Sequence, residues 1–211
     1  TRNASTGVGT LIHAAMEQLT VGGAAISAEL EATGAEQLWA AVAQRWDELE
    51  FDADWLSRST KANAQRMVQR LHGYLRAFVA DGGTLIGGEQ RFEFRIPLVG
   101  QEPESGPAPA EARAGFAYVR GVIDRVERLA DGTVVIVDLK TGKNESRIDA
   151  GGAENLQLAA YQLAYLSEAI DGTEQTRLGG AQLLLVHQPN PATMSVVTPT
   201  QAPLDKERAA E

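Results

Sequence analysis

Cysteine is absent from this chain of 211 residues. The absence excludes disulfide bonds, thiolate zinc sites, a thiol nucleophile and an iron–sulfur cluster held by the chain itself. Any metal must therefore bind to oxygen and nitrogen ligands. No run of about 18 apolar residues is present either. The sequence thus predicts neither a membrane span nor a secretory signal, and we expect a cytoplasmic protein that does not bind membranes.

Positive charge is scarce, because 19 Lys and Arg stand against 28 Asp and Glu, for a formal net charge of −9. Such a chain is not a polycation that coats nucleic acid or an anionic membrane, so any basic contact surface must be local. The length fits one large domain spanning residues 1–211. The chain begins with Thr1 rather than Met, and we expect it to be part of a longer protein.

Apolar residues recur at helical spacing through the first 83 residues and predict three helices. The third helix spans about 54–80 and ends at Gly82-Gly83, a typical stop signal. The three apolar stripes are Val8, Ile12, Ala15 and Leu19; Leu38, Val42, Trp46 and Leu49; and Val68, Leu71, Leu75 and Phe78.

The apolar period then changes to two over 91–98, which predicts a half-buried strand followed by a Pro-, Gly- and Glu-rich loop at 99–113. An Asp131-Gly132 turn separates the next two strands. The later elements are strands at 116–129 and 133–140, a helix at 154–170, a strand at 181–187 and a short strand around 194–198.

This order of elements predicts an α/β fold in which a mixed sheet is flanked by helices. Within it we expect a helical region at 1–83, a sheet-and-helix core at 84–200 and a tail at 201–211.

The hairpin around the Asp131-Gly132 turn carries the residues that indicate chemistry. Asp138 and Lys140 are two residues apart and share a strand face, and Asp124 is expected to share one with Val122 and Val126. A tight turn lets Asp124 and Asp138 converge across adjacent strands. Facing carboxylates repel unless a cation lies between them, and oxygen ligands of this kind suit Mg²⁺.

The alternative is an exposed hairpin in which Lys140 pairs with an aspartate. The apolar run before Asp138 and the Thr141-Gly142 pair after Lys140 favour the metal site.

Four segments together resemble the RecB-like branch of the PD-(D/E)XK nuclease superfamily. They are GTLIHAAME (9–17), GVIDRVE (121–127), VVIVDLKTG (134–142) and NLQLAAYQLAY (155–165). The resemblance implies a restriction-endonuclease-like core with an added N-terminal helical region. It also implies hydrolysis of DNA phosphodiester bonds with Mg²⁺ or Mn²⁺.

The resemblance further implies Asp124 and Asp138 as metal ligands, together with the backbone carbonyl of Leu139, and Lys140 as the catalytic lysine. His13 matches a helical histidine that reaches the metal, and the alternative is a plain surface histidine.

Three further site residues follow from the same match. Glu89, just before the first predicted strand, matches by position an acid that holds a second metal or a water, or it is simply solvated. Gln157 and Tyr161, one helical turn apart, match a Q-x-x-x-Y motif at the edge of the active site. The alternative is a polar flank, since both are expected to lie off the core stripe of Leu156, Ala159, Leu163, Leu166 and Ile170.

Basic residues without an intervening acid predict a local surface for DNA on the third helix. They are Arg58, Lys61, Arg66, Arg70 and Arg76, and the alternative is a solvated helix face. Arg66 and Arg70 are the candidates there. Arg125 is expected to touch phosphate or to pair with Glu127.

The sequence therefore predicts a metal-dependent deoxyribonuclease domain, exonuclease or endonuclease, in a DNA repair or recombination machine with a helicase region in the same or a partner chain. One alternative is an inactive nuclease-like module that binds DNA or serves as architecture. The intact set of Asp124, Asp138 and Lys140 argues against it. A second alternative is a hydrolase of another phosphate ester.

Overall fold

The computed structural model describes residues 4–20, 33–97, 116–142 and 155–205. Its centre is a five-stranded sheet in the order β1-β2-β3-β4-β5, in which β3 and β4 are parallel and the other pairs antiparallel. The predicted mixed α/β fold is confirmed. The strands are β1 (Thr84–Pro97), β2 (Phe116–Arg128), β3 (Thr133–Lys140), β4 (Arg177–Leu185) and β5 (Thr200–Gln201).

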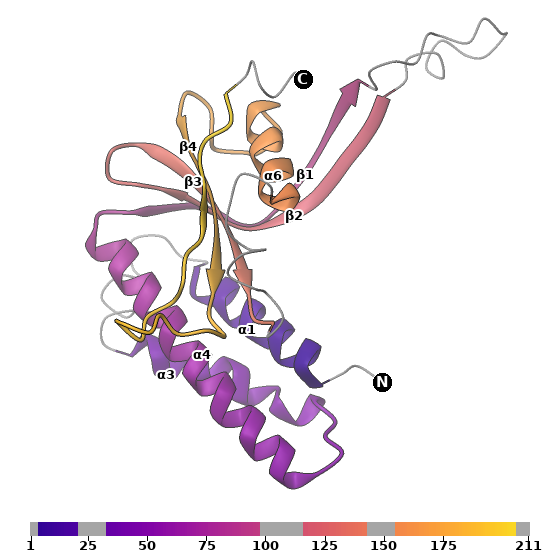
Figure 1. Ribbon diagram of the computed structural model, residues 1–211, viewed down its shortest axis with the longest axis vertical. Helices are drawn as coiled ribbons and strands as arrows, with labels where there is room; N and C mark the ends of the chain where they lie inside the picture. The colour runs from indigo at the N-terminus through magenta and orange to yellow at the C-terminus, as the bar shows by residue number, and fades with distance from the viewer. Residues whose placement is uncertain (1–3, 21–32, 98–115, 143–154, 206–211) are drawn as a thin grey trace, which may run out of the picture.

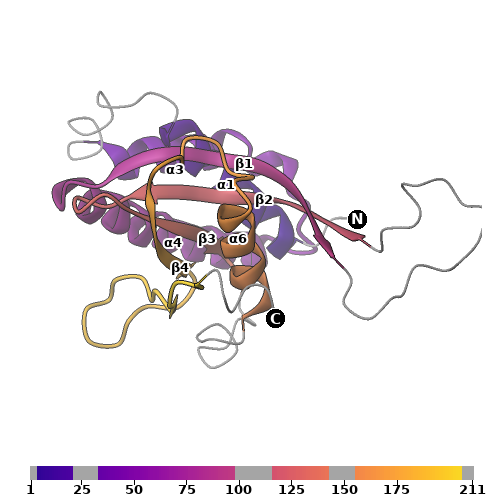
Figure 2. The ribbon, with the colours of Figure 1, turned by 90° about the horizontal axis from the view of Figure 1, so that it is seen from above.

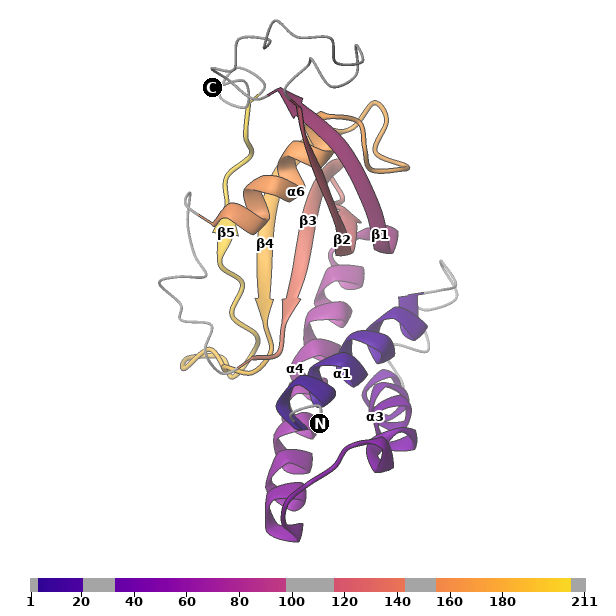
Figure 3. The same cartoon turned by 90° about the vertical axis from the view of Figure 1, so that its right-hand side faces the viewer.

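Helices cover both faces of this sheet (Figures 1 and 3). Three helices pack on one face and α6 on the other. None of the helices in the described ranges is both long and apolar enough to cross a membrane. The helices are α1 (Ala4–Thr20), α3 (Gly34–Gln44), the 3₁₀ turn η2 (Trp46–Glu48), α4 (Asp54–Ala80) and α6 (Leu156–Leu166).

Strand β3 lies between these two helical layers, which explains its nearly continuous apolar sequence. Val137 and Leu139 pack against α1, α3 and α4, whereas Val134 and Ile136 pack toward α6. Because side chains alternate along a strand, Asp138 continues the row of Val134 and Ile136 toward α6. The strand thus delivers its two charged residues to one side of the sheet at its C-terminal end.

The hairpin between β2 and β3 forms at the predicted turn. Gly132 has φ +82°, a conformation that favours glycine, and Asp131 Oδ1 accepts hydrogen bonds from the Thr133 amide at 2.9 Å and hydroxyl at 2.6 Å. The pairing register then runs from Arg128 opposite Val134 to Arg125 opposite Val137. Asp124 and Asp138 are the next residues along this register.

Two predicted strand starts are wrong, and one predicted strand is absent from the described residues. The first strand begins at Thr84 instead of residue 91, because pairing with β2 includes a Gly-rich segment that shows no apolar alternation. The later core strand begins at Arg177 instead of residue 181. In place of a strand at 194–198, the structure has an isolated bridge between Leu185 and Val197 and then β5. The predicted loop at 99–113 lies outside the described residues.

Helix α6 turns a different face to the core than its leucine spacing predicts. Leu156 is 83% exposed, whereas Leu158 and Tyr161 are buried. Gln162 is also buried, because its amide donates to Gln201 Oε1 at 2.8 Å and its oxygen accepts from the Leu204 amide at 2.8 Å. Because its polar atoms have hydrogen-bond partners, Gln162 can be buried without a large free-energy cost. The burial of Gln162 sets which face of α6 points inward, and Tyr161 lies on that face.

Replacing Leu158 with Ala should lower the free energy of unfolding by about 2–5 kcal/mol, because the change leaves a cavity in a fully buried position. Leu156→Ala is the matched control on the same helix and should change it by less than about 0.5 kcal/mol. Urea unfolding of both variants measures the difference. Equal destabilisation by the two changes would contradict the helix orientation described here.

Candidate metal and catalytic site

Asp124 lies where β2 and β3 separate. Ladder pairing ends at Arg125 and Val137, and the Oδ2 atom of Asp124 accepts a hydrogen bond from the Leu139 amide at 2.6 Å. Leu139 is buried, so its amide needs an acceptor once the strands part. The Asp124 carboxylate accepts the hydrogen bond that a backbone carbonyl of β2 would otherwise accept. This hydrogen bond holds Asp124 next to the end of β3.

His13 reaches this point because α1 packs closely against the end of β3. A Cβ atom on Gly9 would lie 2.6 Å from Thr141 Oγ1, so only glycine allows this approach without a shift of the threonine. One helical turn later, His13 Nδ1 lies 3.3 Å from Asp124 Oδ1. The predicted site histidine is thus beside the predicted site aspartate.

Glu89 completes a first cluster from β1. It stands opposite Asp124, between the Gly88–Arg125 and Gln90–Ile123 pairs, and its φ of +49° is uncommon for a non-glycine residue. Ligand atoms of His13, Glu89 and Asp124 all lie within 4.8 Å of one another. Glu89 lies inside the first strand instead of before it. Strained backbone of this kind typically gathers at functional sites.

A second cluster forms around Asp138 on the α6 side. The Lys140 ammonium lies 2.9 Å from Asp138 Oδ2 and donates to Gln157 Oε1 at 2.8 Å. The Asp138 Oδ1 atom accepts from Gln157 Nε2 at 3.0 Å and from the Tyr161 hydroxyl at 3.1 Å. The expectation that Gln157 and Tyr161 both lie off the core is wrong for Tyr161, which is 6% exposed.

Carboxylates dominate the electrostatics of the two clusters. Burial raises the pKa of Asp138, Lys140 opposes this rise and the charge of Asp124 adds to it. Burial and Asp124 likewise raise the pKa of Glu89. Burial lowers the pKa of His13, but its hydrogen bond to Asp124 and the surrounding carboxylate charges outweigh that effect and raise it. Without a cation, the repulsion among these carboxylates therefore favours the protonated forms of Asp138, Glu89 and His13. A bound cation would relieve the same repulsion.

The donor set fits a hard divalent cation. The two clusters together contain three carboxylates, one imidazole and a single lysine. Oxygen-rich sites of this kind suit Mg²⁺ or Mn²⁺. His13, Glu89 and Asp124 are already gathered, and Asp138 adds its charge from the Lys140 side. Leu139 contacts Asp124 through its amide, and the role of its carbonyl stays a prediction.

The family model of the PD-(D/E)XK nuclease superfamily matches residues 1–211. The chain belongs to this superfamily. Asp138-Leu139-Lys140 has the residue types and spacing that the (D/E)XK part of the superfamily name describes. No curated protein sequence matches the chain.

Among the solved structures similar to this chain is one described as the crystal structure of SSO0001. The match covers 93% of this chain and 70% of that chain, with a TM-score of 0.34 and 10% sequence identity.

The sequence predicts that Arg125 either contacts phosphate or pairs with Glu127. The structure is inconsistent with the phosphate contact. Its side chain is buried, its Nε lies 2.7 Å from Glu127 Oε1, and its guanidinium lies 5.6 Å from the centre of the Phe78 ring. The alternative pairing with Glu127 is the one that the structure shows. A guanidinium enclosed in this way cannot reach DNA.

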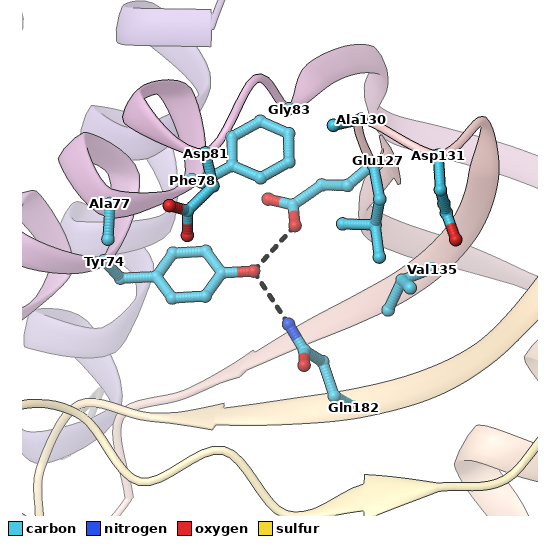
Figure 4. A pocket seen from close by; sticks show the side chains of 11 residues that line it. Tyr74, Ala77, Phe78, Asp81, Gly83, Glu127, Ala130, Asp131, Val135 and Gln182 are labelled. Atoms are coloured by element: carbon cyan, nitrogen blue, oxygen red, sulfur yellow. Dashed lines mark hydrogen bonds between the residues drawn. The ribbon is translucent and has the colours of Figure 1, made fainter.

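Glu127 also takes part in a second set of hydrogen bonds, with Tyr74 and Gln182 (Figure 4). Glu127 Oε2 accepts from the Tyr74 hydroxyl at 2.6 Å, and that hydroxyl accepts from Gln182 Nε2 at 2.7 Å. The network joins β2 to α4 and to β4. Sequence reasoning missed it, although two charged residues alternating with buried Val126 were a usable signal.

The two candidates on α4 differ in their contacts. Arg70 donates to the backbone carbonyls of Val186 at 2.7 Å and His187 at 3.2 Å, and burial lowers its pKa. It anchors α4 to the end of β4, and its predicted role as a DNA contact stays a prediction. Arg66 is exposed, hydrogen-bonds to Asn63 and stays a candidate.

Mn²⁺ at about 100 times its dissociation constant should stabilise the protein by about 2.7 kcal/mol, or about 5–10 °C in Tm for a chain of this size. Asp124→Ala should remove most of this shift, because it deletes the carboxylate that is grouped with His13 and Glu89. Asp131→Ala, which removes an exposed acid at the hairpin turn, is the matched control and should retain the shift. Thermal melts with and without Mn²⁺ test this, and a full shift in Asp124→Ala would contradict the assignment.

Proposed function

We propose that this member of the superfamily is a RecB-like, metal-dependent deoxyribonuclease domain that hydrolyses phosphodiester bonds in DNA. The observation that carries the proposal is the position of Lys140. Its ammonium is held between Asp138 and Gln157, beside the cluster of His13, Glu89 and Asp124.

Four side chains and one carbonyl would hold the cation, which is Mg²⁺ or Mn²⁺ in this proposal. When bound, it supplies positive charge at the scissile phosphate and lowers the pKa of a water molecule at the site. The residues that would hold it are His13, Glu89, Asp124, Asp138 and Leu139 through its carbonyl.

Lys140 would act on the reacting phosphate directly. A protonated ammonium cannot ligate a cation, so it donates hydrogen bonds to a phosphate oxygen or to the attacking water. Two fixed partners, at 2.8 and 2.9 Å, restrict its position before DNA binds. Donors held in place in this way stabilise a transition state without reorganising during the reaction.

Gln157 and Tyr161 would serve as positioning residues. Gln157 Nε2 donates to both Asp138 Oδ1 and the Tyr161 hydroxyl, at 3.0 and 2.8 Å. Burial raises the pKa of Tyr161, so its hydroxyl stays protonated and donates to the same carboxylate oxygen. Together they orient Asp138 so that its other oxygen faces Lys140.

The biological role that we propose is DNA repair or recombination, in the cytoplasm, next to a helicase region of the same or a partner chain. The four RecB-like segments support this role, and Arg66 on α4 is a candidate DNA contact. The alternative is an inactive DNA-binding or architectural module. The complete set of Asp124, Asp138 and Lys140 disfavours it, since an inactive module would not need a lysine paired with Asp138.

Cleavage of labelled DNA should require Mg²⁺ or Mn²⁺, stop with EDTA and return when the metal is restored. Asp138→Ala should abolish it, because it removes both a ligand and the partner of Lys140. Gel assays with single- and double-stranded substrates measure the activity. Cleavage that persists in EDTA would contradict the metal mechanism, and inactivity with every substrate would favour the inactive module.

Lys140→Ala should lower single-turnover cleavage about 10²–10³-fold at saturating DNA, because it removes a donor used in the transition state. Mn²⁺ affinity should be nearly unchanged. Arg45→Ala, which removes an exposed basic side chain at the end of α3, is the control and should cleave at the wild-type rate. A raised KM with wild-type kcat would mean that Lys140 only binds DNA.

A further inference from the structure

The β1–β2 hairpin carries a row of exposed side chains that the fold does not use. Its two strands run on together beyond the rest of the sheet (Figures 1 and 2). Phe92 and Phe94 of this hairpin pack toward α6, whereas the residues alternating with them are exposed. The exposed residues, which we name the hairpin face, are Arg91, Glu93, Arg95, Phe116, Tyr118, Arg120 and Val122.

The strand register brings these residues together on one surface. Arg95 stands opposite Tyr118, Glu93 opposite Arg120, and Arg91 opposite Val122. Directly opposed residues of antiparallel strands share a face, so the three arginines lie on the same surface as two neighbouring aromatic rings and Glu93. The Arg95 guanidinium lies 5.7 Å from the centre of the Phe116 ring.

The composition of the hairpin face is unusual for this protein. Tyr118 is 65% exposed and Phe116 is 43% exposed, and large exposed aromatic side chains that lie next to one another mark interaction sites. Among the described residues, neither Arg91 nor Arg120 forms an ion pair, and the only contact shown for Arg95 is the Phe116 ring. In a chain of net charge −9, this face therefore carries three guanidinium groups against a single carboxylate, that of Glu93, which forms no ion pair with them among the described residues.

The hairpin face leads directly to the metal cluster. Phe116, Tyr118, Arg120 and Val122 occupy alternate positions of β2, and Asp124 is the next position in that row. At about 3.3 Å per residue, Tyr118 lies about 20 Å from Asp124 along the strand. Val122, between them, is 39% exposed, so the row is open to solvent up to the site.

We propose that the hairpin face binds single-stranded DNA and guides it along β2 to Asp124, an inference that rests on the proposed nuclease function. Unpaired bases stack on aromatic side chains, and arginines neutralise the phosphates between them. In a duplex, the base faces are already stacked on one another and cannot use Phe116 or Tyr118. The exposed rings therefore favour a single strand over a duplex.

The length of the hairpin face sets the length of DNA that it engages. From Phe116 to Asp124 the strand spans about 26 Å. That span holds about eight nucleotides at a stacked spacing of about 3.4 Å, and fewer if the strand is extended. Oligonucleotides shorter than this should lose affinity, because they cannot occupy the site and the hairpin face together.

Binding of a fluorescein-labelled oligothymidylate of about 20 nucleotides tests the proposal. The titrations are made in EDTA, so that no cleavage occurs. Tyr118→Ala should weaken binding about 5–100-fold, and Tyr118→Phe should restore it, because the stacking ring returns. Trp55→Ala, which removes another aromatic residue that is 65% exposed, is the matched control and should bind like wild type.

Salt dependence tests the arginines separately. Arg120→Ala should reduce the slope of log affinity against log salt by about 0.7, the value for one phosphate contact with a single strand. Arg177→Ala, at the start of β4, is the exposed control and should leave the slope unchanged. Arg66→Ala gives the competing outcome: a reduced slope there, with none in Arg120→Ala, would place the DNA on α4 and overturn the proposal.

The results separate this proposal from the proposed function. Wild-type affinity and kcat/KM in Tyr118→Ala and Arg120→Ala, with cleavage intact, would overturn the hairpin face and leave the nuclease function standing. If these two variants bind DNA more weakly but the wild-type protein cleaves no substrate, the nuclease function would be overturned and the hairpin face would stand. Equal affinity for a duplex of the same length would overturn the preference for a single strand. Unchanged Tm values exclude unfolding as the cause of weaker binding.

Discussion

The hydrogen bond from the Leu139 amide to Asp124 Oδ2 is the contact on which the candidate site depends. It forms where β2 leaves β3 to continue with β1, a point at which a buried amide loses its ladder partner. An unsatisfied buried amide costs about 1–3 kcal/mol, so the acceptor is strongly favoured. A carboxylate in this position satisfies the backbone and stays turned toward the metal cluster. One residue thus stabilises the fork in the sheet and serves as the central acid of the site.

Elements from both faces of the sheet meet at this fork. Helix α1 brings His13 from one side, with the close approach at Gly9, and α6 brings Gln157 and Tyr161 from the other. Strand β1 adds Glu89 through its irregular backbone. The site is therefore a junction of five elements, α1, β1, β2, β3 and α6, and its geometry responds to the packing of each of them.

The buried network behind the site supports the same fork. Arg125 and Glu127 follow Asp124 on β2, and Tyr74 and Gln182 connect them to α4 and β4. Replacing one member of a buried charged pair is strongly destabilising, because the remaining charge is left without a partner. These two charged residues next to Asp124 thus hold the strand in place and do not contact substrate, although both lie in the segment that resembles the nuclease motif.

Local patterns were sufficient for most of the fold. Alternation predicted the strands of the β2–β3 hairpin to within one residue, and the helical stripes located α1, α3 and α4, because these signals depend on near neighbours. Long-range pairing decided the start of β1. On α6, hydrogen bonds from Gln162 to the C-terminal segment decided which face is buried. Leucine spacing contains no information about such a distant partner.

The candidate site divides in the same way. The sequence by itself determined that Asp138 and Lys140 share a face of β3, because side chains two apart on a strand must do so. Only the tertiary structure decided that Val122 is exposed whereas Val126 is buried, although both were expected on the face of Asp124, that Glu89 lies inside β1, and that Arg125 is buried. Each of these depends on which strand pairs with which and where the pairing stops. That information lies in contacts between residues far apart in the chain, and the packed sheet alone supplies it.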